Sequence, residues 1–142
     1  MGQPQLLPPS IDELIPEKHL VRVINTVIDQ MELTTLIKEY KGGGTSSYHP
    51  KMLLKVVVYA YAEQIYSGRQ IAKAVRENIP FMWISGGNRP DFRTINRFRS
   101  EKLKGRIQGV FTEVLEYLIE TGYVKLEHYF VDGTKIEADA NR

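Results

Sequence analysis

Apolar residues recur at helical spacing along most of the chain. One face collects Leu20, Val23, Ile24, Val27, Ile28 and Met31. This pattern predicts an amphipathic helix over 16–30, with Pro16 at the first helical position. A weaker helix is predicted over 31–40, and the glycine-rich stretch that follows predicts a flexible loop over 41–47.

Residues 51–66 are apolar on nearly all sides. The run of three valines, Val56–Val58, could form a strand if it stood alone. The length of the segment, the leading Pro50 and its content of Met, Leu, Ala and Glu favour a helix instead. A helix that is apolar all round is buried, so this segment is predicted to be the central helix of a helical domain.

Polar residues before the apolar runs mark where further elements begin. Ser10 and Glu13 form a capping-box pattern that starts a short turn, and Ser67 with Gln70 forms another before a helix over 68–79. Three further segments are then predicted: a short helical turn and loop over 80–90, a helix over 92–104 capped by Asp91, and a helix over 106–121 ended by Gly122. Gly105 and Gly109 predict a break between the last two.

The period of the pattern changes after residue 122. Residues 126–131 are rich in strand formers, and residues 134–138 alternate with period two. Asp132-Gly133 between them is a hairpin signal. We therefore predict a β-hairpin within 123–142 that begins a sheet.

Composition narrows the class of protein. Of 142 residues, 42% are hydrophobic and 25% are charged, which is typical of a globular chain. No apolar run approaches the roughly 20 residues of a membrane span, and residues 1–9 are predicted to be an extended lead-in rather than a secretory signal. The absence of cysteine excludes disulfides and thiolate zinc sites. We expect a cytoplasmic protein that does not contact a membrane.

Charge is distributed unevenly along the chain. Residues 89–106 carry seven basic and two acidic residues, a local charge of +5 where the whole chain has only +2. On a helix begun at Phe92, the side chains of Arg93, Asn96 and Arg97 are expected to point outward. Thr94 and Arg99 are candidates for the same face. A second helix with Arg, Thr and Asn near its start is how a helix-turn-helix presents side chains to the DNA major groove.

Two alternatives to DNA binding remain open for this basic helix. It could be a solvated surface, or its arginines could pair with Glu113, Glu116 and Glu120 of the next helix.

Asp132 is the second candidate for chemistry. A carboxylate at the end of a strand can hold a metal ion, although most Asp-Gly pairs are simply turns. Glu137 and Asp139 are more typical of a solvated strand face.

Several motifs together resemble the N-terminal domain of bacterial insertion-sequence transposases of the InsH type. They are Tyr48-His49-Pro50, Ser67-Gly68-Arg69-Gln70-Ile71, Phe81-Met82-Trp83, Arg89-Pro90-Asp91-Phe92-Arg93-Thr94-Ile95 and the tail Val131-Asp132-Gly133-Thr134-Lys135-Ile136-Glu137-Ala138. The resemblance implies a helical DNA-binding domain over 10–122, followed over 123–142 by the first hairpin of a truncated RNase H-like α/β domain. The fold class expected is therefore mainly α, with a helix-turn-helix-like unit.

Together with the basic helix, the resemblance implies that the chain is the DNA-binding N-terminal part of a transposase, which recognises the ends of an insertion sequence for transposition. Expected partners are double-stranded DNA at the terminal inverted repeats of the element, and either another copy of the chain or the rest of the transposase. DNA contacts are expected from Arg69, Arg89, Arg93, Thr94, Asn96, Arg97, Arg99, Lys102 and Lys104. Another interpretation is a non-catalytic assembly module that pairs transposase subunits while DNA binds elsewhere.

Catalysis in this family depends on three carboxylates, a DDE triad, that bind two Mg²⁺ or Mn²⁺ ions. Asp132 matches the first carboxylate, which makes it the expected catalytic and metal-ligand position. The other two lie downstream of residue 142 in the family. We therefore expect Asp132 to be idle here, with no metal bound to this chain alone.

Overall fold

Every regular element in the described part of the chain is helical. The computed structural model describes residues 10–32 and 48–122. Its elements are a 3₁₀ turn, η1 (Asp12–Leu14), and the helices α1 (Leu20–Gln30), α3 (Pro50–Ala62), α4 (Gly68–Glu77), α5 (Ile79–Ile84), α6 (Phe92–Glu101) and α7 (Ile107–Glu120). None of these helices is long and apolar enough to cross a membrane. The expectation of a mainly helical protein is confirmed for this part.

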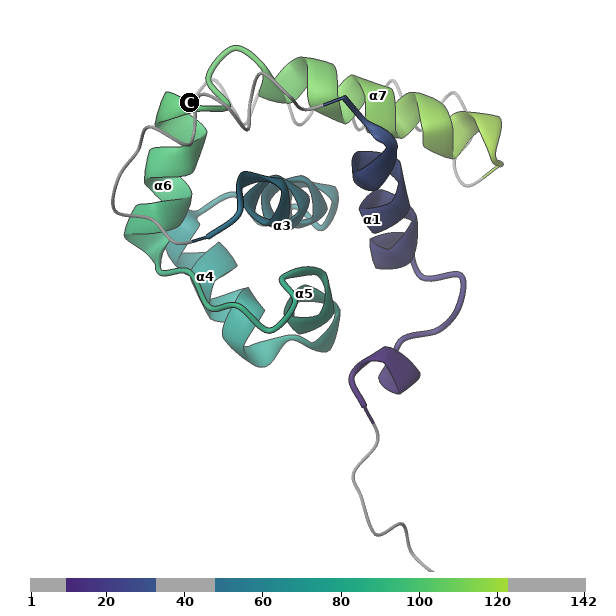
Figure 1. Ribbon diagram of the computed structural model, residues 1–142, viewed down its shortest axis with the longest axis horizontal. Coiled ribbons are helices and arrows are strands. Elements are labelled where there is room, and N and C mark those ends of the chain that lie inside the picture. The colour runs from purple at the N-terminus through teal and green to yellow at the C-terminus, as the bar shows by residue number, and fades with distance from the viewer. Residues whose placement is uncertain (1–9, 33–47, 123–142) are drawn as a thin grey trace, which may run out of the picture.

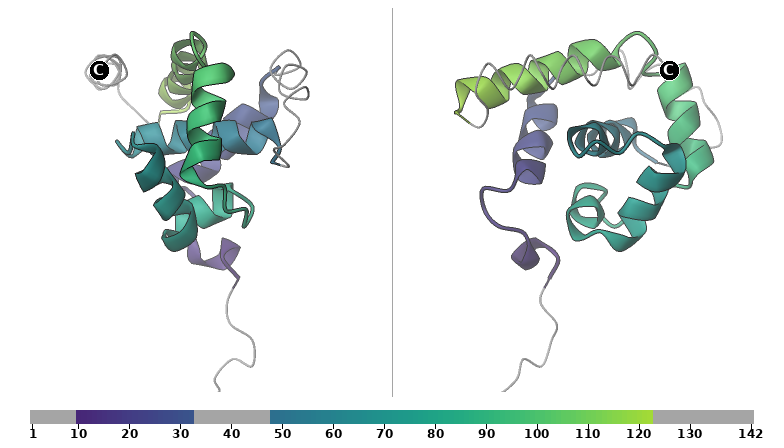
Figure 2. Two further views of the ribbon diagram at one scale, coloured as in Figure 1. Left: turned by 90° about the vertical axis from the view of Figure 1, so that its left-hand side faces the viewer. Right: turned by 180° about the vertical axis from the view of Figure 1, so that it is seen from behind.

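The apolar helix α3 lies at the centre, and the other helices surround it (Figure 1). Its contacts with α1, α4, α5 and α6 bury it on several sides, which explains why its sequence is apolar all round. Leu54, Val57 and Val58 are completely buried. The view from behind shows the same ring of helices around α3 (Figure 2, right). The choice of helix over strand for Val56–Val58 is thus confirmed.

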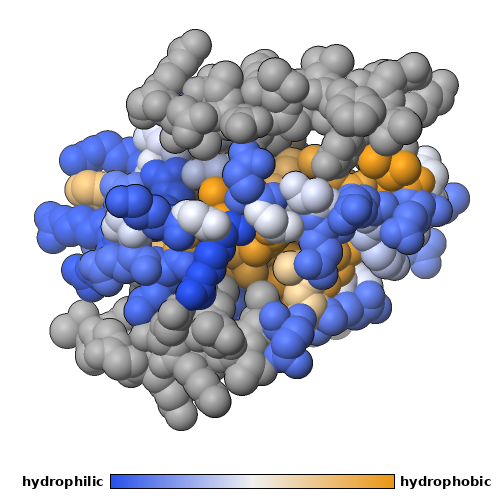
Figure 3. All heavy atoms as spheres, turned by 90° about the horizontal axis from the view of Figure 1, so that it is seen from above, coloured by the Kyte–Doolittle hydropathy of each residue, from blue (hydrophilic) through white to orange (hydrophobic). Residues whose placement is uncertain are grey.

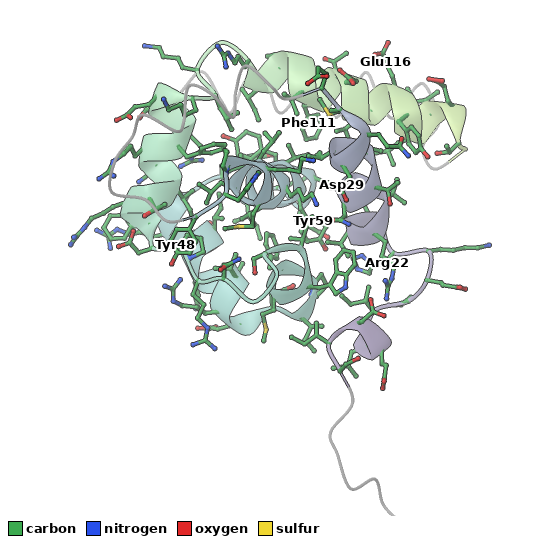
Figure 4. All side chains as sticks on the ribbon, viewed as in Figure 1. Arg22, Asp29, Tyr48, Tyr59, Phe111 and Glu116 are labelled. Carbon is green, nitrogen blue, oxygen red and sulfur yellow. The ribbon has the colours of Figure 1, made fainter. Side chains whose placement is uncertain are left out.

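Tyr59 joins α3 to its neighbours inside this ring (Figure 4). Its ring centroid lies 4.6 Å from that of Phe81 in α5. Its hydroxyl donates a hydrogen bond of 2.7 Å to Glu63 Oε2. Burial, together with the neighbouring Glu63 carboxylate, raises the pKa of Tyr59, so the phenol remains protonated.

Capping side chains begin the helices where the sequence predicted them. Ser67 Oγ accepts the backbone N–H of Gln70 at 3.3 Å, and Asp91 Oδ1 accepts that of Thr94 at 2.9 Å. His49 Nδ1 caps α3 in the same way, with a bond of 3.0 Å. Such caps satisfy N–H groups that have no partner within the helix.

The predicted start of the first long helix is wrong by four residues, since α1 begins at Leu20 rather than at Pro16. Residues 16–19 form a turn in which the His19 N–H donates to the Pro16 carbonyl at 3.1 Å. His19 then caps α1 through its Nδ1 atom. The Arg22 guanidinium donates to the carbonyls of Pro16, Asp12 and Ile15, and these bonds hold the segment outside the helix.

Arg22 also forms a clasp between the N-terminal segment and α5 (Figure 4). Its Nη1 atom lies 2.9 Å from Asp12 Oδ1, and its guanidinium lies 5.1 Å from the ring centroid of Trp83. Trp83 Nε1 donates to the same Asp12 oxygen at 3.0 Å. Hydrogen bonds first from Arg22 and then from Trp83 hold the pKa of Asp12 below its ordinary value.

Two predicted helix ends are also corrected. Residues 51–66 were expected to be one helix, but α3 ends at Ala62 because Gln64 adopts a positive φ of 64° and the Ile65 N–H turns back to the Ala60 carbonyl. The helix expected over 92–104 ends at Glu101. The break predicted before the last helix is confirmed at Gly105, where φ is +79°.

Helix α7 lies across the top of the ring in Figure 1 and packs against α1. Its inner face contains Phe111, Val114, Leu115 and Leu118, all buried. Glu113, Glu116 and Glu120 are exposed on its outer side, and Glu116 points away from the body of the molecule (Figure 4). The outer side of α7 is therefore acidic.

Seen from above, the coloured surface at the end formed by α6 is hydrophilic, and apolar side chains show mainly toward the middle and the other end (Figure 3). The basic residues of 89–106 thus belong to a polar end of the molecule.

Four sequence predictions fall outside the described residues: the lead-in over 1–9, the helix over 31–40 beyond Glu32, the loop over 41–47, and the β-hairpin and RNase H-like domain over 123–142.

Candidate nucleic-acid interface

The candidate interface is built on the close packing of α4 against α6. Gly68, the first residue of α4, faces the Asn96 side chain of α6. A Cβ atom added at Gly68 would lie 2.8 Å from Asn96 Cγ, closer than real contacts allow. Only glycine permits this approach without displacing Asn96.

Arg99 fixes the same junction from the other side. Its Nη2 atom donates to Asn96 Oδ1 at 2.7 Å, and its Nη1 atom donates to the Tyr66 carbonyl and to the Tyr61 hydroxyl at 3.3 Å. These bonds tie α6 to the end of α3 and to the segment that leads into α4. Asn96 and Arg99 were expected to contact DNA, but both make internal hydrogen bonds here.

Arg76 joins α4 to the connection that precedes α6. It donates to the Ala72 and Pro90 carbonyls at 2.8 and 3.0 Å, and to the Arg89 carbonyl at 2.8 Å. Sequence reasoning did not single out this residue. Arg76 lies in the last turn of α4, where a basic side chain can bind backbone carbonyls that have no partner in the helix. This position was the signal in the sequence that Arg76 could have a structural role.

Two arginines from different helices meet at one aromatic ring. The Arg69 guanidinium of α4 lies 3.8 Å from the ring centroid of Phe92, and that of Arg93 lies 5.6 Å from it. Both contacts are of the cation–π kind. The packing of α4 on α6 thus brings two exposed arginines to the same aromatic ring.

The remaining expected DNA contacts are distributed along α6 and the segments on either side of it. Arg97 is exposed on α6 and Thr94 is half-buried in its first turn. Arg89 is exposed in the connection before α6. Lys104 is exposed after α6, and Lys102 is half-buried. We call Arg69, Arg89, Arg93 and Arg97 the basic surface.

One carboxylate lies at the edge of the basic surface. Asp91 accepts the Thr94 N–H, and this bond together with the nearby charge of Arg93 holds the pKa of Asp91 below its ordinary value. Asp91 is therefore ionised at neutral pH and stays committed to capping α6.

The described residues contain no group of three His, Asp or Glu side chains that could hold a metal ion. The expected metal ligand, Asp132, lies outside them. Chemistry at Asp132 therefore remains a prediction from the sequence.

The unit formed by α4 and α6 shares with a helix-turn-helix the packing of one helix across another. It differs in the connection, since α5 and a loop occupy residues 78–91 between the two helices. This connection is longer than the short turn of that motif.

Comparison with known proteins places the chain in a family. No curated protein and no solved structure matches it. Residues 9–101, which include α1 through α6, match the family model described as Transposase domain (DUF772). Because the match extends over more than half of the chain, this protein belongs to that family of transposase domains.

Proposed function

We propose that this chain is the DNA-binding N-terminal part of a transposase, and that it recognises the ends of an insertion sequence through the basic surface. The observation that carries the proposal is the pair of guanidinium groups, Arg69 and Arg93, on the Phe92 ring. Family membership supports a role in transposition.

The electrostatics of this pair favour an anionic ligand. Two like charges held close together repel each other, and a phosphate between them relieves that repulsion. Arginine also binds phosphate oxygens with two parallel hydrogen bonds, which suits the DNA backbone. Arg97 and Arg89 extend the positive charge on either side along the chain.

The structure suggests separate roles for the expected DNA residues. Arg93, Thr94 and Arg97, near the start of α6, are the candidates to read bases or to position the helix in a groove. Asn96 and Arg99 instead hold α6 in place through Tyr66 and Gly68. Lys102 and Lys104 are candidates for phosphate contacts.

The test measures binding of the purified chain to duplex DNA that carries an element end, over a range of salt concentrations. Six or seven phosphate contacts predict a slope of log K against log salt of roughly −5 to −6. Arg69→Gln and Arg93→Gln should each make the slope shallower by about 0.9. Lys18→Gln, which removes an exposed charge near η1, is the matched control and should leave the slope unchanged.

Unaltered affinity in both arginine variants would reject the basic surface and favour a merely solvated face. If the chain bound no DNA at low salt but formed a stable dimer, the assembly module would be the better description.

A further inference from the structure

A surface hollow of about 510 Å³ lies between α1, the start of α3 and the connection from α5 to α6. Its lining includes His49, Lys51, Met52, Lys55, Trp83 and Asn88. None of these residues belongs to the basic surface. The hollow is open to solvent rather than enclosed.

One wall of the hollow carries positive charge. Lys51 and Lys55 both approach a single carboxylate, Asp29 Oδ1, at 3.8 and 2.7 Å. One carboxylate neutralises only one ammonium, so the cluster keeps a net charge of +1. The ion pairs also hold both lysine side chains at this wall, which reduces the entropy lost when a ligand binds.

His49 adds a hydrogen-bond donor to the same wall. Its Nδ1 atom accepts the Lys51 N–H at 3.0 Å. In a neutral imidazole the proton must then lie on Nε2, which becomes a donor.

Part of the lining is apolar. It consists of Met52, Ile84 and Trp83. The polar atom of Trp83 is already used, because Nε1 donates to Asp12. A ligand that has an anionic group next to a less polar portion, as a phosphodiester has beside its sugar, matches this combination of basic and apolar side chains.

The position of the hollow points to DNA as the source of that phosphodiester. Asn88 lines the hollow and precedes Arg89 and the cap of α6. In Figure 1 the connection from α5 to α6 runs in front of α4, and the chain leading into α3 lies on the same side. A continuous nucleic acid can therefore follow this connection from the basic surface to the hollow.

We propose that the hollow is a second phosphate-binding site, which takes a backbone phosphodiester of the DNA held at the basic surface. The proposal rests on the proposed function, because it assumes that DNA reaches the first turn of α6. Lys51, Lys55 and His49 donate to the phosphate oxygens, and Trp83 and Met52 contact the sugar.

The test uses the full chain and a mixed-sequence 30-base-pair duplex. The double variant Lys51→Gln/Lys55→Gln should make the salt slope shallower by about 1 to 2 and weaken binding roughly ten- to a hundredfold at 0.1 M salt. Lys51→Arg/Lys55→Arg keeps the charge and should bind as the unmodified chain does. Lys18→Gln is again the control for charge, and circular dichroism of each variant confirms its folding.

The outcomes separate this proposal from the proposed function. If Arg93→Gln weakens binding but Lys51→Gln/Lys55→Gln does not, the hollow is not a DNA site and the basic surface stands. If neither weakens binding, both proposals fail. Loss of binding in the Gln and Arg double variants alike would show that side-chain shape rather than charge matters, and would also overturn the phosphate site.

The fluorescence of Trp83 distinguishes the two sources of phosphate. Trp83 is the only tryptophan in the chain and lines the hollow. The duplex should change its emission in the unmodified chain, and the change should be lost in Lys51→Gln/Lys55→Gln. Saturation by inorganic phosphate that the duplex cannot displace would identify a free-anion site and overturn the assignment to DNA.

Discussion

Single side chains decide how α4 meets α6. Gly68 leaves room for Asn96, and Asn96 in turn accepts a hydrogen bond from Arg99. With a larger residue at position 68, the Asn96 side chain would have to move, and its hydrogen bond to Arg99 would be disturbed.

Gly68→Ala should lower the free energy of unfolding by about 1–3 kcal/mol, because the added methyl group displaces Asn96 and disturbs its bond to Arg99. Urea denaturation measures the change. Gly109→Ala is the matched control, since a Cβ at this position in α7 would meet nothing within 4 Å. It should be neutral or stabilise by about 0.5–1 kcal/mol. If Asn96→Ala fails to relieve the cost of Gly68→Ala, the proposed clash is not its cause.

Asp12 makes the N-terminal clasp sensitive to acid. Its pKa in the folded chain is lower than the ordinary 3.8, so the clasp contributes its full stability above that pH and loses it as the pH falls through the folded value. Trp83 emission should therefore be constant from neutral pH to about 5 and change below about 3.8.

Two substitutions check this assignment. Asp12→Asn should shift the emission already at neutral pH and remove most of the acid transition. Asp91→Asn should leave the transition in place, although Asp91 also has a lowered pKa, because it lies at the start of α6 rather than at Trp83. An acid transition that survives Asp12→Asn would assign it to another group.

At the scale of elements, α6 has one side that packs against the rest of the molecule and another that is exposed to solvent. Ile95 and Phe98 are buried, and Arg99 binds the Tyr66 carbonyl at the end of the preceding segment. Arg93 and Arg97 are exposed. Arginines on the same helix thus differ in their surroundings: Arg99 makes internal hydrogen bonds, and Arg93 and Arg97 are exposed.

Arg99→Ala should lower the free energy of unfolding by about 1–3 kcal/mol, because it leaves the Tyr66 carbonyl and Asn96 without their donor. Arg93→Ala should change stability by no more than about 0.5 kcal/mol, yet weaken DNA binding. Thermal unfolding and DNA titration on the same samples check both statements. Equal loss of stability in the two variants would contradict this division of roles.

Local features of the sequence predicted the elements well. The caps at Ser67 and Asp91 and the all-apolar α3 depend on residues within a few positions of one another, so their patterns can be read directly. The start of α1 was misplaced because Arg22 holds the carbonyls of residues before the helix, a side-chain contact that periodicity does not reveal.

For the whole molecule, contacts between distant segments limited the prediction of the site. The basic residues of 89–106 stood out in the sequence, but their roles did not. Arg99 reaches a carbonyl 33 positions earlier in the chain, and Arg76 reaches one 14 positions later. Gly68 directly follows the capping Ser67. Because alanine forms helices better than glycine where there is space for its side chain, a glycine at this position was a weak signal that another group packs closely against it.

The acidic outer side of α7 and the basic surface give the molecule an electric polarity. A DNA duplex that approaches the glutamates of α7 is repelled, and one that approaches Arg69 and Arg93 is attracted. For the proposed DNA ligand, this polarity would favour encounters with α6 leading, before any contact forms. The benefit lies in the association rate, and it fades as salt shortens the reach of the field to about 8 Å at physiological ionic strength.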